Sequence, residues 1–181
     1  MTLRATPNSW GSVAKTLHWG MFVLLAAVMV VGYYMTDLPL GMTKMKIYAL
    51  HKSVGILLLG LVSLRIVWRL VDRRPAMEPM PAWQRVVAAV AVMVLYVCML
   101  GLPLSGWLYN SAAGFPLRWF NLVNLPPLMA SNPAVKGMIK EWHETGAAIF
   151  LCVIGAHVLG SLKHHFVDRD RTLARMLPGR K

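Results

Sequence analysis

Long apolar runs separated by short polar segments dominate the chain. Four of these runs reach the roughly 20 residues that a helix needs to cross the hydrocarbon core of a bilayer. They predict membrane-spanning helices over about residues 14–36, 47–71, 83–109 and 138–166. The sequence therefore predicts an all-α fold, an integral membrane four-helix bundle that forms one domain over residues 1–181.

The segments within and between these runs add detail. Pro103 and Gly106 indicate a kink or a close helix approach in the third span. Four prolines between residues 110 and 137 rule out one long helix there, although a short surface helix is expected over about 117–124. Residues 17–35 are too long for the apolar core of a cleaved signal peptide, so we expect the first helix to be retained.

Composition and charge agree with a membrane location. Hydrophobic residues make up 57% of the chain, the mean hydropathy is +0.54 and the formal net charge is +12. The basic residues lie between apolar runs, which indicates orientation in a bilayer rather than nucleic-acid binding. Cys98 and Cys152 lie inside the runs and form neither a CxxC nor a CxxCH motif, so we expect both to be small apolar core residues.

The distribution of Lys and Arg predicts the orientation of the bundle. Thirteen of the 19 fall on the side that holds both termini, whereas six fall on the other side. The positive-inside rule therefore places both termini in the cytoplasm. The six basic residues expected on the outer side are Lys44, Lys46, Lys52, Arg118, Lys136 and Lys140.

Four histidines lie within or at the start of the predicted spans: His18, His51, His143 and His157. Ionisable residues are costly inside a bilayer and indicate function, and histidine is the usual axial ligand of a b-type haem. A proton relay or a metal transporter is the alternative. Both would be expected to place carboxylates in mid-membrane, and no Asp or Glu lies in the middle of a predicted span.

The predicted depths of the histidines decide which of them can meet. His18 and His157 fall near the cytoplasmic side, whereas His51 and His143 fall near the outer side. His157 follows His143 by 14 residues, about 21 Å of helix rise, and both project from nearly one face. We therefore predict two b haems in the bundle core, one held by each pair.

Other residues near these histidines are candidates for supporting roles. Arg65 and Arg69 are predicted to bind haem propionates, although both could instead reach lipid headgroups. His164 and His165 are expected to be polar residues at the membrane interface, with proton supply to a quinone as the alternative. Four glycines either admit the haem macrocycle or serve ordinary helix packing: Gly20, Gly55, Gly146 and Gly155.

The ordered set of motifs resembles the bacterial cytochrome b561 family of small di-haem proteins of the inner membrane. The resemblance covers most of the chain. It rests on Lys15-Thr16-Leu17-His18-Trp19, His51-Lys52-Ser53-Val54-Gly55, Arg65-Ile66-Val67-Trp68-Arg69-Leu70, Trp142-His143-Glu144 with His157, Lys163-His164-His165-Phe166 and Arg175-Met176-Leu177-Pro178.

The resemblance implies that the four histidines are haem ligands in a multi-pass protein of the bacterial inner membrane. It also implies a superoxide oxidase-like activity, in which electrons from periplasmic superoxide reduce ubiquinone. Lys52, Arg118 and Lys136 would then help to steer superoxide towards the outer haem. The alternative is an electron-transfer subunit that serves a partner dehydrogenase or hydrogenase. The expected partners are the lipid bilayer, quinone, and superoxide or a redox protein, with no nucleic acid.

Overall fold

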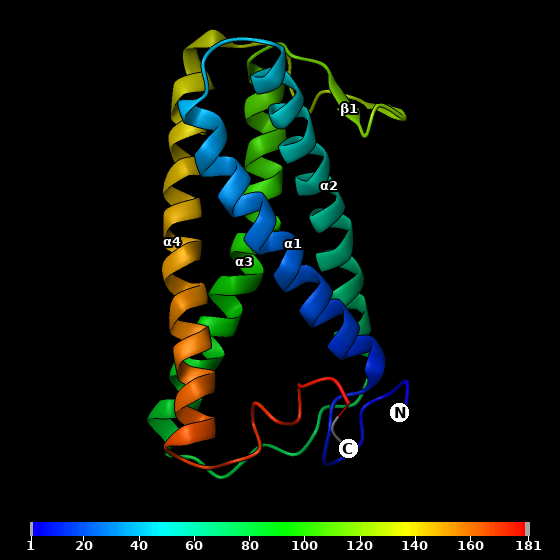
Figure 1. Ribbon diagram of the computed structural model, residues 1–181, viewed down its shortest axis with the longest axis vertical. Coiled ribbons are helices and arrows are strands. Elements are labelled where there is room, and N and C mark those ends of the chain that lie inside the picture. The colour runs from blue at the N-terminus through cyan, green and yellow to red at the C-terminus, as the bar shows by residue number, and fades with distance from the viewer. Residues whose placement is uncertain (1, 180–181) are drawn as a thin grey trace.

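A computed structural model describes residues 2–179 of the chain. This part contains four helices and two short strands, which are α1 (Ser12–Asp37), α2 (Met42–Val71), α3 (Ala82–Ala112), β1 (Leu117–Trp119), β2 (Val123–Leu125) and α4 (Pro133–Phe166). Both termini lie at one end of the bundle and the strands lie at the other, here called the terminal end and the hairpin end (Figure 1). Each helix is long and apolar enough to cross a membrane, which confirms the predicted helical membrane bundle.

Two of the helices, α2 and α4, begin five residues earlier than the apolar runs predict. Apolar residues mark the part of a helix that lies in the bilayer, whereas capping groups decide where the helix itself begins. At α4 the side chain of Asn132 accepts a hydrogen bond from the N–H of Ala134 at 3.1 Å, and Pro133 occupies the first turn. α2 starts at Met42, within the polar segment before the second apolar run, and its N-cap residue Gly41 provides no side-chain hydrogen bond.

The prediction of a surface helix over residues 117–124 is wrong, because these residues lie in an antiparallel β-hairpin. Leu117 pairs with Leu125 and Trp119 pairs with Val123. The turn contains Phe120 and Asn121 at φ values of 45° and 58°, a left-handed conformation that ends the pairing and that asparagine tolerates better than most residues. The hairpin is fixed to α2, since the indole N–H of Trp119 donates to the Ser53 carbonyl at 3.1 Å.

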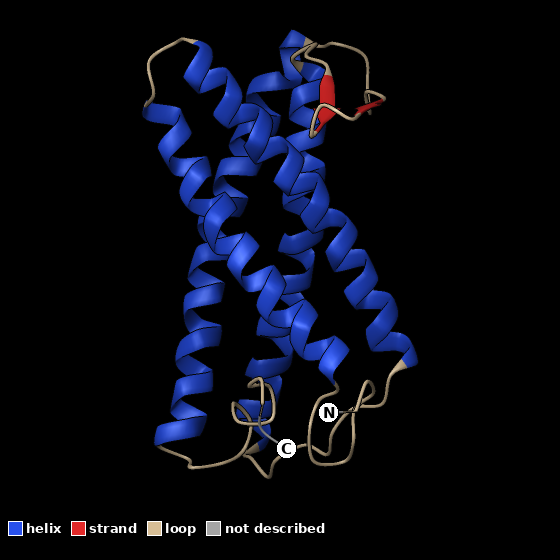
Figure 2. Ribbon diagram, turned by 45° about the vertical axis from the view of Figure 1, so that its right-hand side comes forward, coloured by secondary structure: helices blue, strands red, loops and turns tan. Residues whose placement is uncertain are grey.

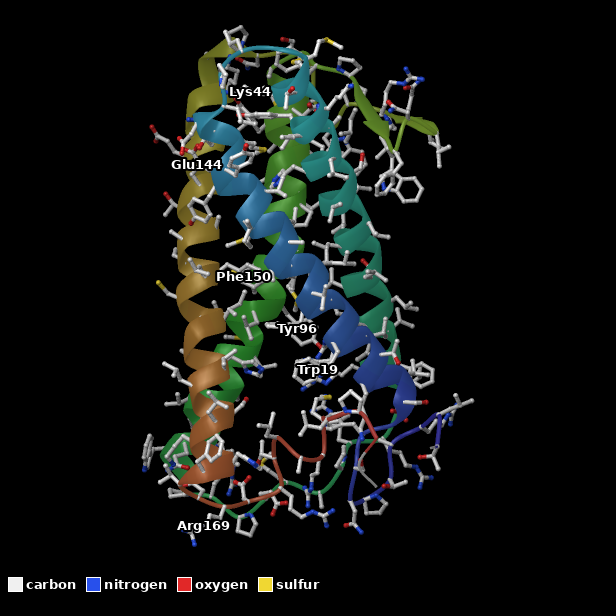
Figure 3. All side chains as sticks on the ribbon, viewed as in Figure 1. Trp19, Lys44, Tyr96, Glu144, Phe150 and Arg169 are labelled. Carbon is white, nitrogen blue, oxygen red and sulfur yellow. The ribbon has the colours of Figure 1, made fainter. Side chains whose placement is uncertain are left out.

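The helices pack unevenly around the bundle. α1 packs mainly against α2, α2 against α3, and α3 against α4, whereas α1 crosses the bundle obliquely and contacts α4 far less (Figures 1 and 2). Few side chains are fully buried, among them Met21, Val62 and Phe150 (Figure 3). Large apolar side chains such as Val30, at 69% exposure, point outward. In a bilayer these side chains meet lipid.

Pro103 lies inside α3 without ending it. A proline removes one backbone hydrogen bond from the helix and pushes its ring against the preceding turn. Figure 1 shows that α3 changes direction along its length, as a proline inside a helix is expected to cause.

Three segments meet at the terminal end. The N-terminal segment contacts the linker between α2 and α3, because the N–H of Ala5 donates to the carboxylate of Asp72 at 3.2 Å. The C-terminal tail joins them, since the indole N–H of Trp19 in α1 donates to the Met176 carbonyl at 2.9 Å (Figure 3). The terminal end of the bundle is thus closed by chain segments that are far apart in sequence.

Candidate functional site

The structure brings together the histidines in the same two pairs that the sequence predicts. His18 of α1 faces His157 of α4, with 6.3 Å between ring centroids and an interplanar angle of 62°. His51 of α2 faces His143 of α4 at the same centroid separation and an angle of 79°. The first pair lies towards the terminal end and the second towards the hairpin end. Their role as haem ligands stays a prediction.

The separation of the rings agrees with a metal between each pair. Two imidazoles that coordinate one iron from opposite sides, each through a bond of about 2 Å, have ring centroids about 6 Å apart. Two imidazoles joined directly by an N–H···N hydrogen bond have ring centroids closer together than this. Such a pair could not bind one iron between its rings without moving apart. The donor set therefore fits b-type haem at both depths, because two neutral imidazoles are its usual axial ligands.

Two glycines clear space for the rings of the pair near the hairpin end. A Cβ added to Gly32 of α1 would lie 3.0 Å from Cε1 of His51. A Cβ added to Gly106 of α3 would lie 3.2 Å from Cε1 of His143. Gly106 was expected to mark a kink or a close approach, whereas Gly32 was missed because it is distant in sequence from any histidine. Both positions need the absence of a side chain for the imidazole to fit.

The four glycines that lie near histidines in sequence behave differently from Gly32 and Gly106. A Cβ on Gly20, Gly55 or Gly155 would meet nothing within 4 Å, so each faces open space. This is the room that a flat macrocycle needs beside a helix. In contrast, Gly146 packs against the side chain of Leu102, at 3.1 Å, and so serves helix packing between α4 and α3.

Each histidine ring has its own hydrogen-bonding environment. Nδ1 of His143 lies 3.1 Å from the Leu102 carbonyl oxygen and 3.0 Å from Oγ of Ser105. Nδ1 of His18 lies 3.0 Å from a guanidinium nitrogen of Arg65. Nδ1 of His51 is buried without a hydrogen-bond partner among the described residues, although the carbonyl of Val28 faces the ring.

The two arginines predicted to bind propionates gather around Tyr96 of α3. Nε of Arg65 donates to the Tyr96 hydroxyl at 3.2 Å, and the Arg69 guanidinium lies 5.7 Å from the centre of the Tyr96 ring. Sequence reasoning missed Tyr96, because an isolated tyrosine in an apolar run carries no signal. Arg65 reaches His18 as well, so it lies at the pair near the terminal end, while Arg69 lies one turn closer to that end.

A small cleft lies beside these arginines. Its volume is about 40 Å³, little more than the volume that one water molecule occupies in the liquid. Nε1 of Trp68 is buried there without a hydrogen-bond partner among the described residues. The cleft is lined by Trp10, Ala14, Arg65, Trp68, Arg69, Asp72, Arg73, Arg74, Tyr96 and Met176.

The basic side chains at the hairpin end differ in how they are engaged. The ammonium of Lys52, next to His51, donates to Oδ1 of Asn110 at 3.0 Å. Arg118 in β1 and Lys136 in the first turn of α4 are exposed. Lys44 donates to the Leu38 carbonyl at 2.7 Å and so completes the end of α1.

Lys140 is also engaged, since its ammonium pairs with Glu144 one turn later on α4 at 3.1 Å. Both side chains of this ion pair are exposed (Figure 3 labels Glu144). The structure therefore leaves Arg118 and Lys136 as the more accessible of the predicted steering residues, whereas Lys52 is held by Asn110 and is less exposed. Lys46 is exposed as well.

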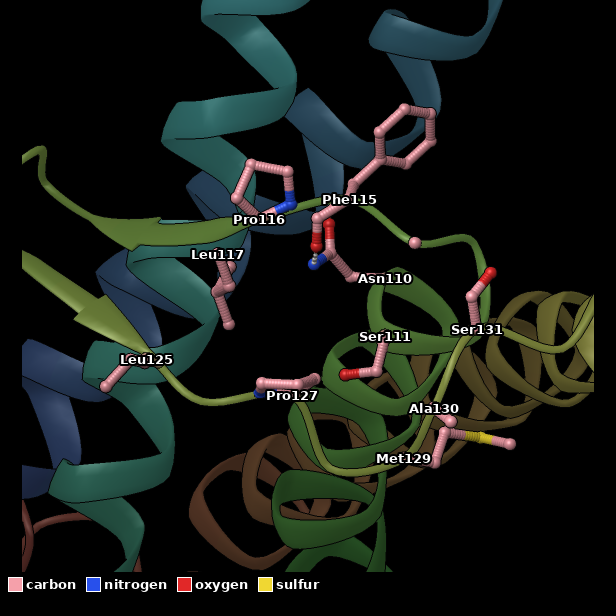
Figure 4. Close-up of a pocket in the computed structure, with 11 residues that line it drawn as sticks. Asn110, Ser111, Phe115, Pro116, Leu117, Leu125, Pro127, Met129, Ala130 and Ser131 are labelled. Atoms are coloured by element: carbon pink, nitrogen blue, oxygen red, sulfur yellow. Dashed lines mark hydrogen bonds between the residues drawn. The ribbon is translucent and has the colours of Figure 1, made fainter.

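A larger cavity opens between the hairpin and the loop that precedes α4 (Figure 4). Its volume is about 320 Å³. Asn110, on its wall, accepts from Lys52 and donates to the Phe115 carbonyl at 2.7 Å. Asn110 therefore connects the wall of the cavity to Lys52, the residue after His51, through one hydrogen bond. It is lined by Asn110, Ser111, Gly114, Phe115, Pro116, Leu117, Leu125, Pro127, Met129, Ala130 and Ser131.

His164 and His165 take separate roles at the terminal end. Nδ1 of His164 lies 2.6 Å from an oxygen of Asp170 and 3.2 Å from one of Asp168. Burial raises the pKa of Asp170, but hydrogen bonds from Thr172 and His164 outweigh it and hold this pKa below its ordinary value. His165 instead stacks edge-on against the Phe166 ring at 4.8 Å. His164 therefore fastens the C-terminal tail to the end of α4.

The fold and the paired histidines are those of a membrane-bound b-type cytochrome. A sequence model of the family described as prokaryotic cytochrome b561 matches residues 9–179, and the chain belongs to this family. Membership confirms the resemblance seen in the sequence, and it implies b-type haem and electron transfer in the membrane.

Three curated proteins show how closely this chain resembles known relatives. It is 30% identical to Cytochrome b561 homolog 2 of Escherichia coli K12, over 98% of this chain and 95% of the relative. It is 31% identical to Cytochrome b561 homolog 1 of the same organism, over 96% and 99% of the two chains. Over 73% of this chain and 75% of the relative, it is 32% identical to a protein of Yersinia pestis named Probable superoxide oxidase CybB.

Proposed function

We propose that this chain binds two b haems and moves electrons across the membrane between them. The observation that supports this most strongly is the pair of histidine couples, each 6.3 Å between ring centroids, at opposite ends of one bundle. Both couples use α4, so His143 and His157 set the two depths about 21 Å apart along that helix. Bound haem supplies one-electron redox chemistry at each depth.

In this proposal the inner haem is held by His18 and His157, and the outer haem by His51 and His143. Arg65 is close enough to His18 to bind a propionate of the inner haem, and Arg69 is one turn further out. The open faces of Gly20, Gly55 and Gly155 leave room for the macrocycles. The protein supplies ligands, burial and cations, while the redox change belongs to the haem.

We further propose that the terminal end lies in the cytoplasm and the hairpin end in the periplasm of a bacterial inner membrane. Support comes from the larger number of Lys and Arg on the terminal side. The N-terminal segment, the α2–α3 linker and the C-terminal tail all lie on that side (Figure 1). Electrons that enter at the hairpin end would thus move inward.

The proposed electron donor is superoxide. A small anion is attracted by exposed cations, and Arg118 and Lys136 are exposed at the hairpin end. Lys52 lies closest in sequence to the outer pair and is held by Asn110. The name of the Yersinia relative supports the same donor.

The proposed acceptor is ubiquinone, bound near the cleft at the terminal end. Trp68 has a buried indole N–H without a partner among residues 2–179, and such a donor suits a quinone carbonyl oxygen. The cleft is too small for a quinone in this conformation, and Met176 of the tail covers part of it. Binding therefore requires the tail to shift. Two superoxide anions give two dioxygen molecules, and their two electrons with two protons convert one quinone to quinol.

Stopped-flow mixing of superoxide with the oxidised, haem-loaded protein in lipid nanodiscs tests this proposal. We expect haem reduction faster than spontaneous dismutation, followed by reoxidation when ubiquinone is present in the nanodisc. The His143→Ala protein is the matched control, because it should lose the outer haem and the fast phase together. Purified protein without haem would overturn the cytochrome proposal. Two haems without a fast phase would overturn superoxide as the donor.

The hairpin favours a second candidate function, electron transfer for a partner dehydrogenase or hydrogenase. Leu122 at its tip is 78% exposed and the neighbouring Val123 is 50% exposed. Exposed apolar residues on a projecting hairpin are typical of a protein contact. A dehydrogenase that copurifies with the wild type, but not with the Leu122→Ser variant, would favour this function over superoxide oxidation.

A further inference from the structure

His143 is held by α3, a helix that contains no histidine of its own. Its Nδ1 faces two oxygen atoms, the carbonyl of Leu102 at 3.1 Å and Oγ of Ser105 at 3.0 Å. The Ser105 hydroxyl itself donates to the Leu102 carbonyl at 2.9 Å. Because the hydroxyl proton of Ser105 is used in this bond, its Oγ can only accept a hydrogen bond from Nδ1 of His143. Both oxygens are therefore acceptors, so the proton of the neutral imidazole lies on Nδ1 and the Nε2 lone pair is free.

The Leu102–Gly106 turn of α3 is built to receive this ring. Pro103 has no N–H, so the helical bond that is lost is the one to the Met99 carbonyl, in the turn before this one. Gly106 leaves open the space that the ring occupies, since a Cβ there would approach Cε1 to 3.2 Å and Nδ1 to 3.5 Å. A serine and a glycine at neighbouring positions thus have separate but compatible roles around one imidazole.

His18 and His51 lack this arrangement. Nδ1 of His18 faces a guanidinium, which can only donate. Nδ1 of His51 has no hydrogen-bond partner among the described residues. Of these three histidines, His143 is therefore the one whose Nδ1 proton is fixed by two acceptors.

We propose that the Leu102–Gly106 turn orients His143 for coordination through Nε2 and lowers the reduction potential of the outer haem, with Ser105 as a positioning residue. Acceptors on the Nδ1 proton raise the electron density of the ring, and an electron-rich ligand stabilises ferric over ferrous iron. The inference rests on the proposed role of His143 as a haem ligand. It adds that contacts from α3 lower the reduction potential of the outer haem, so that an electron arriving there passes to the inner haem more readily.

Three variants of the haem-loaded protein test the inference by potentiometric titration with visible spectra. Ser105→Ala removes one acceptor from Nδ1 and also the hydroxyl that donates to Leu102. At a fixed potential we expect the ratio of reduced to oxidised outer haem to rise by up to about fivefold, the effect of one hydrogen bond. The inner haem should not change. Ser105→Thr keeps the hydroxyl and should restore the wild-type potential.

Ser63→Ala is the matched control. Ser63 also donates to a carbonyl of its own helix, Leu59 at 2.8 Å, but it is exposed and lies away from the rings. It should leave both potentials unchanged. The outer haem is identified as the one that is missing from His51→Ala protein. A shift of equal size in Ser63→Ala would show that loss of any helical serine has this effect, and would overturn the inference.

The remaining outcomes separate this inference from the proposed function. If the wild type binds two haems and Ser105→Ala leaves the outer potential unchanged, the role of Ser105 is overturned while haem ligation stands. If the wild type binds no haem, the proposed function itself fails. Should Ser105→Ala lose the outer haem, Ser105→Cys is titrated instead, because a thiol is a weaker hydrogen-bonding group of similar shape. An unchanged potential in Ser105→Cys would overturn the inference.

Discussion

The guanidinium of Arg65 on α2 lies 3.0 Å from Nδ1 of His18 on α1. Since a guanidinium can only donate, Nδ1 accepts in this conformation and the imidazole proton lies on Nε2. Coordination of iron through Nε2 therefore requires Arg65 to release His18. A propionate of the inner haem is the natural new partner for a guanidinium inside a membrane protein.

Arg65→Ala is expected to lower the reduction potential of the inner haem. Ferric haem carries one more positive charge than ferrous haem, so a nearby cation favours the reduced state. Loss of that cation should favour the ferric state by on the order of 1 kcal/mol. Redox titration measures the change, and Arg85→Ala, at an exposed position near the start of α3, is the control. An unchanged inner potential would show that Arg65 does not lie beside the haem.

Removal of single histidines should remove haems in a fixed pattern. His51→Ala and His143→Ala should each lose the outer haem, whereas His18→Ala and His157→Ala should each lose the inner one. Each variant is expected to fall from two haems to one per chain, as measured by pyridine haemochrome absorbance. His165→Ala is the control and should keep both. A His143→Ala protein with two low-spin haems would contradict the pairing.

Added methyl groups at the two glycines that face imidazoles should disturb the outer haem. Gly32→Ala and Gly106→Ala place a carbon within 3.0 Å and 3.2 Å of ring atoms, so the rings must shift. Overpacking of this kind typically costs about 1–3 kcal/mol. We expect partial loss of the outer haem and a lower unfolding temperature.

Gly60→Ala is the matched control for these variants, because a Cβ there would meet nothing within 4 Å. Alanine in place of a helical glycine should stabilise the helix by up to about 1 kcal/mol. Equal haem loss in all three variants would show that the space at Gly32 and Gly106 has no special role.

The hydrophobic pattern and the histidine spacing predicted the four helices and the two histidine pairs. They succeeded because bilayer thickness fixes the length of a spanning helix, and the alternating direction of the helices then fixes the depth of each residue. Capping groups set the true helix ends, as Asn132 does for α4, and a hydropathy pattern does not register them. The hairpin was missed because its strands have only three residues each.

The supporting residues could not be found in the same way. Tyr96, Gly32 and Ser105 are common residues in apolar runs, and their relation to a histidine depends on how two helices are rotated against each other. That rotation results from packing, which one sequence does not reveal. In contrast, Arg65 could be placed because its spacing from His51 put it on a known face at a known depth.

The steering of superoxide should depend on charge and salt. Arg118→Gln and Lys136→Gln are expected to slow the stopped-flow reduction severalfold at low ionic strength, because both remove an exposed cation. The effect should shrink as salt screens the charges over a Debye length of about 10 Å at 0.1 M. Lys140→Gln should have a smaller effect, since its charge is paired with Glu144. Equal rates in all variants at low salt would contradict steering by these residues.

Asp170 should hold the C-terminal tail against the end of α4 throughout the neutral pH range. Its carboxylate accepts from the Thr172 N–H at 2.8 Å and faces His164, and its pKa lies below the ordinary value. The native state therefore favours the ionised form, so this stabilisation is fully present above about pH 4 and is lost as pH falls through the lowered native pKa. From pH 5 to 8, Asp170→Asn should speed amide hydrogen exchange of the tail severalfold. Asp37→Asn, at the opposite end of the bundle, should leave the tail unchanged. An effect of Asp170→Asn that disappeared at pH 5 would mean that the carboxylate is already protonated there, against the lowered pKa.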